Sequence, residues 1–89
     1  MIALFAPKIK MKKRLTVIPS DKIVCIDDVC AFIDSDFPWI ESNIHAIQWD
    51  EVKQTGHIEY TDGTSNRVIN NIKKYQSAID LFNATVQQQ

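Results

Sequence analysis

The spacing of apolar residues changes once along this chain, and that change constrains the fold more than any other feature. Before residue 70, apolar and polar side chains alternate in short runs, which is the period of β-strands. After it, Ile72, Tyr75, Ile79, Phe82 and Val86 follow at intervals of three and four, so they share one face of a helix. The sequence therefore predicts an α+β domain. One C-terminal α-helix packs on a small antiparallel, meander-like β-sheet of about four or five strands.

The strand-like runs are separated by residues that favour turns. The runs cover residues 14–18, 22–26, 44–49 and 57–60, with shorter ones at 29–33 and 67–69. Asp27-Asp28 and Asp62-Gly63 are the turn signals, because aspartate and glycine tolerate a positive φ better than most residues. The run 22–26 is apolar on both faces, which predicts a strand that is covered on both sides.

The length of 89 residues accommodates a single domain. We expect the α+β domain to span residues 11–89, since a strand pattern begins soon after Met11. Residues 1–10 are then a flexible N-terminal extension. A short additional strand over residues 2–5 is the alternative, and the sequence does not choose between the two.

The two cysteines and two histidines do not form a recognisable metal site. Cys25, Cys30, His45 and His57 are a legitimate set of zinc ligands, but structural zinc sites carry closely spaced pairs and these histidines are twelve positions apart. Two cysteines are also too few for a disulfide framework, so we expect free thiols buried as small apolar side chains. We expect no metal, no cofactor and, without a secretion signal or a long apolar run, no membrane and a cytoplasmic location.

Charge is unevenly distributed although the net charge is only −1. Basic residues cluster in residues 8–14, whereas the charged residues in 20–51 are all acidic except Lys22. The basic segment lacks interleaved aromatic residues and no helix-turn-helix pattern follows it, so nucleic-acid binding is not expected. No group of residues supplies a nucleophile, a base and an orienting partner together, and we expect a non-enzymatic protein.

Seven residues are candidates for a protein-binding interface: Asp34, Asp36, Trp39, Glu41, His45, Gln48 and Trp49. Tryptophan is enriched at binding hot spots, but a small domain also needs its tryptophans in the core. His45 and Gln48 are unusual in a half-buried strand. His45 and Trp49 alternate onto one face with Ile47, where they either pack together or anchor a partner. The three acids would contribute an acidic binding surface.

Part of the chain resembles a group of small bacteriophage and prophage proteins encoded near tail and tail-fibre genes. The specific strings are IHAIQW at residues 44–49 and IEYTDG at residues 58–63, and the similarity covers roughly residues 15–82. The sequence departs from the pattern at Asp28, where the family carries glycine, and in a longer link over residues 50–55. Both departures fall in turns. The family implies no catalytic residues.

The resemblance implies a phage-encoded structural or tail-assembly accessory protein that acts by protein–protein binding. Its partner would be a phage or host protein, or a second copy of the chain. The location would be the cytoplasm of the bacterial host, with incorporation into the virion as a further expectation. The alternative is an inhibitor of a host defence system, in which the acidic surface occupies a basic surface of its target.

Overall fold

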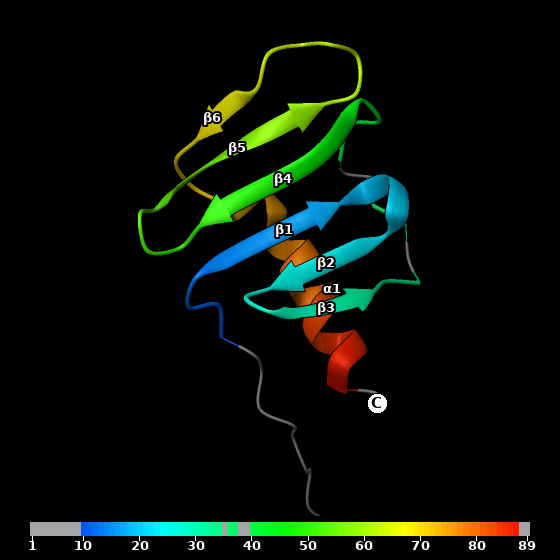
Figure 1. Cartoon of the computed structure of the whole chain (residues 1–89). Coiled ribbons are helices and arrows are strands. Elements are labelled where there is room, and N and C mark those ends of the chain that lie inside the picture. The colour runs from blue at the N-terminus through cyan, green and yellow to red at the C-terminus, as the bar shows by residue number, and fades with distance from the viewer. Residues whose placement is uncertain (1–9, 35, 38–39, 88–89) are drawn as a thin grey trace, which may run out of the picture.

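The computed structural model describes residues 10–34, 36–37 and 40–87, which form an antiparallel sheet with one long helix on a single face (Figure 1). This confirms the α+β class and the C-terminal helix. The expected extension lies almost entirely in residues 1–9, outside the described residues. The same holds for Trp39.

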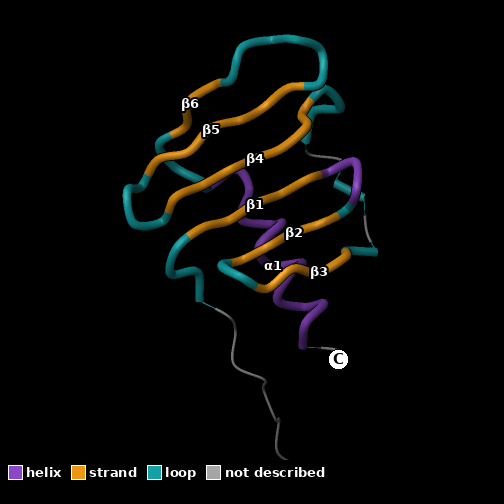
Figure 2. Tube along the Cα trace, viewed as in Figure 1, coloured by secondary structure: helices purple, strands orange, loops and turns teal. Residues whose placement is uncertain are grey.

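The sheet has six strands, not the four or five that the sequence predicted. Its order is β3-β2-β1-β4-β5-β6, so two three-stranded meanders lie side by side and join where β1 pairs with β4 (Figure 2). Each set of three strands is a meander as predicted, but the sheet as a whole is not one continuous meander. The strands are β1 Arg14–Ile18, β2 Ile23–Ile26, β3 Val29–Phe32, β4 Ile44–Asp50, β5 Thr55–Tyr60 and β6 Arg67–Ile69.

One face of the sheet builds the core. Alternate side chains of the central strands point to this face, and the fully buried Val17, Val24 and Ile47 are typical of them. A 3₁₀ turn, η2 (Lys73–Tyr75), leads into α1 (Gln76–Gln87), which places the fully buried Phe82 against the same cluster. The predicted helical stripe therefore packs on the sheet of its own chain.

Two details of the strands differ from the predicted pattern. Strand β2 is covered on one side only: Val24 is buried, whereas Ile23 remains partly exposed on the face away from α1. In β4 the pairing with β5 shifts between Ile44 and Ala46. This irregularity leaves His45 exposed while Trp49 is buried, so the two do not share a face as a regular alternation would require.

Cys25 and Cys30 form a disulfide, which corrects the expectation of free, buried thiols. Asp27 and Asp28 make the two-residue turn between β2 and β3, and Asp27 adopts a φ of 56°. Such a turn places the residues five apart directly opposite each other, with their Cα atoms 4.0 Å apart. Cys25 is partly exposed and Cys30 is exposed, so the disulfide lies on the sheet surface.

Among the described residues, no helix is both long enough and apolar enough to cross a membrane.

Candidate functional site

The face of the sheet away from α1 carries no described helix or loop (Figure 1), and we call it the open face. The strand registers align its side chains in rows across the sheet. The open face comprises Thr16, Ile18, Ile23, Cys25, Cys30, Phe32, Gln48, His57, Glu59 and Val68. Phe32 and Val68 are 72% and 75% exposed, and they lie on the two edge strands, β3 and β6.

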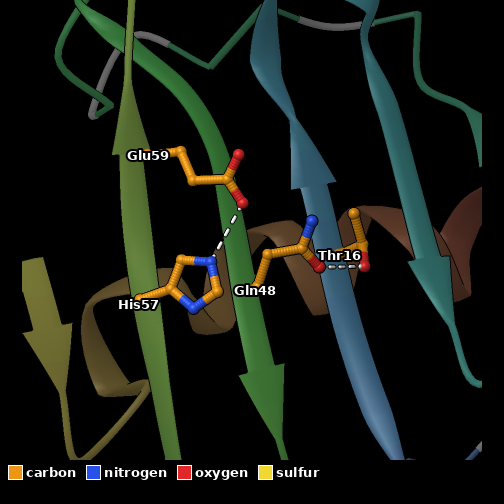
Figure 3. Close-up of polar contacts among 4 residues, drawn as sticks. All are labelled: Thr16, Gln48, His57 and Glu59. Carbon is orange, nitrogen blue, oxygen red and sulfur yellow. Dashed lines mark hydrogen bonds and ion pairs between the residues drawn. The ribbon is translucent and has the colours of Figure 1, made fainter. Parts of the chain in front are cut away.

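Polar side chains occupy the middle of the open face (Figure 3). The Thr16 hydroxyl donates to Oε1 of Gln48 over 2.7 Å, across the β1–β4 pair. On β5, Nε2 of His57 lies 2.9 Å from Oε2 of Glu59, two residues further along the same strand face. The side-chain oxygen of Gln48 thus accepts a hydrogen bond. Its side-chain amide nitrogen makes no hydrogen bond to another described residue and remains able to donate to a partner.

A hollow of about 680 Å³ lies at the end of the open face where β1 begins and the β4–β5 turn projects. Its lining includes Gln48 and His57 and combines basic with apolar side chains. We call it the basic hollow, and its characteristic residues are Lys13, Arg14, Val52, Lys53 and Val68. Val52 and Val68 are both at least three-quarters exposed, so the hollow has an apolar rim open to solvent.

The cations of the basic hollow form no close ion pair with a described carboxylate, although Asp50 lies opposite Arg14 in the β1–β4 pairing and the Asp27 carboxylate acts electrostatically on Lys13. The ion pairs among the described residues involve Lys22, His57 and Lys74, and none involves the three cations of the hollow. Asp50 is the acid that lines it, and its Oδ1 accepts the backbone N–H of Lys53 over 2.9 Å. The hollow therefore presents a net positive charge in a protein whose net charge is −1.

Asp27 fixes the backbone segment that carries two of these cations. Its carboxylate accepts the backbone N–H groups of Lys12, Lys13 and Arg14, at 2.7 Å for Lys13. The hydrogen bond from Lys13 is the largest cause that holds the pKa of Asp27 below its ordinary value, and those from Arg14 and Lys12 act in the same direction. The turn that closes the β2–β3 hairpin thus also positions the first residues of β1 beside the hollow.

The structure brings few of the predicted interface residues together. Gln48 lies on the open face and lines the basic hollow. Trp49 is only 3% exposed; its ring belongs to the core and its Nε1 donates to Glu51 over 2.8 Å, so it cannot serve as an exposed interface anchor. His45 is exposed at the irregularity in β4.

The three predicted acids are exposed, but two of them have internal partners. Asp36 pairs with Lys22 over 3.0 Å, and Glu41 with Lys74 over 2.9 Å. The hydrogen bond from Lys74 lowers the pKa of Glu41, and the same contact raises the pKa of Lys74. Asp34 is exposed beside them in the sequence. The acidic surface is therefore partly neutralised by cations of the chain itself.

Sequence reasoning missed the basic hollow and the pairs in the open face. The His57–Glu59 contact could have been found, because residues two apart on a strand share a face. The disulfide could also have been found, because a two-residue turn at Asp27-Asp28 places Cys25 opposite Cys30 in the hairpin. The hollow left only a partial signal: Lys13 and Arg14 belong to the basic cluster of residues 8–14, whereas Lys53 comes from the β4–β5 turn.

Among the described residues, no group of three or more histidine, cysteine or acidic side chains is placed to hold a metal ion. Comparison with known proteins adds no relative: no family model, no curated protein and no solved structure matches this chain.

Proposed function

We propose that this chain is a non-enzymatic protein-binding domain, and that its open face is the binding surface. The observation that carries the proposal is the uncovered sheet face with exposed Phe32 and Val68. Burying large apolar side chains of this kind is the main driving force for association. Between them, the free amide of Gln48 and the His57–Glu59 pair supply the polar contacts that give an interface its specificity.

The polar groups of the open face support binding better than catalysis. His57 contacts the carboxylate of Glu59, but no described hydroxyl or thiol donates to its ring: Thr16 donates to Gln48 instead. A general base without a nucleophile and an orienting partner is not a catalytic set. The cysteine thiols are joined to each other.

The phage setting of the proposal rests on the IHAIQW and IEYTDG strings. Within that setting we propose a structural or tail-assembly accessory protein, and the disulfide supports a component of the particle. Disulfides persist on virion surfaces and outside cells, whereas reducing systems remove them in a cytoplasm. The alternative of an acidic inhibitor has less support, because Asp36 and Glu41 already pair with Lys22 and Lys74.

Site-specific photo-crosslinking tests the binding surface. A benzophenone amino acid replaces Phe32 or Val68 on the open face, and Ala84, which is exposed on α1, serves as the matched control. We expect both open-face positions, but not position 84, to crosslink one defined virion or assembly protein in phage-producing cells. Equal crosslinking from position 84, or none from the open face, would refute the proposed surface.

Mass spectrometry of purified virions tests the phage role separately. A structural component is present at a defined copy number, and its Cys25–Cys30 peptide is recovered intact under non-reducing digestion. An accessory protein is abundant in the lysate and absent from the particle. Absence from both the particle and its assembly intermediates would contradict the phage role. The crosslinking experiment would then still test whether the open face is a binding surface.

A further inference from the structure

We infer that the basic hollow binds an acidic, partly apolar polypeptide segment of the partner. This inference rests on the proposed function, because it specifies what one end of the open face recognises. The segment is extended. It places carboxylates against Lys13, Arg14 and Lys53, and aliphatic side chains against Val52 and Val68.

The form of the hollow suits a peptide segment. Its volume of about 680 Å³ falls within the roughly 300–1,000 Å³ of ordinary ligand sites. Its lining runs across several strands, from Arg14 on β1 through Gln48 on β4 and His57 on β5 to Val68 on β6. A chain crossing these strands can therefore make a succession of side-chain contacts with the sheet surface.

The charge of the hollow selects for carboxylates. Lys13, Arg14 and Lys53 form no ion pair with a described carboxylate, and the one lining acid, Asp50, accepts a backbone N–H from the β4–β5 turn. Arg14 offers a planar group that binds a carboxylate with two parallel hydrogen bonds. The side-chain amide nitrogen of Gln48 is a further donor on the open face.

The apolar rim distinguishes a peptide from a nucleic acid. Val52 and Val68 offer aliphatic contacts, whereas binding of single-stranded nucleic acid uses aromatic platforms on which bases stack. Trp49 also borders the hollow, but its ring belongs to the core and the residue is 3% exposed, so no base can stack on it.

Fluorescence anisotropy at low salt tests the inference with the full chain. The probe is a labelled ten-residue peptide of alternating glutamate and valine. Controls are the same peptide with glutamine or lysine in place of glutamate, and a labelled oligothymidine. We expect the acidic peptide to bind at least about tenfold more tightly than each control, since opposite charges attract and the valines fit the rim. Amide resonances of Gln48, His57 and Val68 should shift in two-dimensional NMR spectra.

Charge variants locate the interaction. The double variant Arg14→Glu/Lys53→Glu should weaken binding of the acidic peptide by at least about tenfold, whereas Lys73→Glu should change it less than about twofold. Lys73 is an exposed lysine of η2 that does not line the basic hollow. The neutral variant Arg14→Gln/Lys53→Gln keeps the test valid if charge reversal disturbs folding, which circular dichroism monitors.

Three outcomes would overturn the inference. The glutamine peptide binds as tightly as the acidic one, the hollow variants bind like the unmodified chain, or oligothymidine binds more tightly than the peptide. If any of these occurs while benzophenone at positions 32 and 68 still captures a virion or assembly protein, only the acidic occupant is wrong. Loss of that crosslinking as well would refute the proposed function itself.

Discussion

Removing the Cys25–Cys30 disulfide should lower the free energy of unfolding by about 2 kcal/mol. The two cysteines are five residues apart, so the bridge closes a loop of about six residues. In the chain-entropy treatment, such a loop restricts the unfolded ensemble by about 7 cal/mol/K, which is about 2 kcal/mol at 25 °C. Cys25 and Cys30 lie on the open face, so replacing them with serine opens no cavity in the core.

Urea unfolding followed by tryptophan fluorescence measures this loss. The oxidised protein is compared with the reduced protein and with Cys25→Ser/Cys30→Ser. For a small domain with a slope of about 1–2 kcal/mol/M, the midpoint should fall by about 1–2 M urea. The two disulfide-free forms should coincide, and adding reductant to the serine variant should change nothing.

Two results would refute this reasoning. A loss below about 0.5 kcal/mol would show that the β2–β3 hairpin keeps its ends together in the unfolded state, so the bridge removes little entropy. A loss above about 4 kcal/mol would show that the sulfur atoms support the core, contrary to their exposure. An unchanged slope with the expected shift would show that this short loop restricts the unfolded chain without changing the surface exposed on unfolding.

Three further predictions concern the core, a sheet contact and pH. Phe82→Ala should cost about 3–5 kcal/mol in urea unfolding because this ring is fully buried, whereas Phe32→Ala on the open face should cost less than about 1 kcal/mol; equal losses would contradict the assigned core. Gly56→Ala should cost about 2–3 kcal/mol in urea unfolding, because the added Cβ would overlap the backbone oxygen of Gln48; an unchanged midpoint would contradict this. Asp27 has a pKa below its unfolded value of 3.8, so its contribution to stability is complete above that value and is lost as the pH falls through the lower folded pKa. Asp27→Asn should therefore flatten the fall of the urea midpoint between about pH 5 and pH 2, and an unchanged profile would show that other carboxylates cause it.

The local pattern of the sequence determined the elements of this protein. Short alternating runs specified strands, with β1 and β6 at the predicted bounds, and the change of period specified the C-terminal helix. These features depend on each residue's close neighbours in the chain, because a pleated strand repeats every two residues and a helix every 3.6. The Asp27-Asp28 turn even fixed the partner of Cys25, although sequence reasoning did not draw that conclusion.

The tertiary structure decided how these elements meet. β1 pairs with β4, placing Val17 opposite Ile47 across thirty residues of sequence, and no local pattern specifies that pairing. It depends on which faces bury the most apolar area once α1 covers one side of the sheet. The same choice exposed one face of β2, buried Trp49 and gathered Arg14 and Lys53 at a single hollow. The proposed binding surface is thus a property of the assembled sheet, because its side chains become neighbours only when the two meanders join.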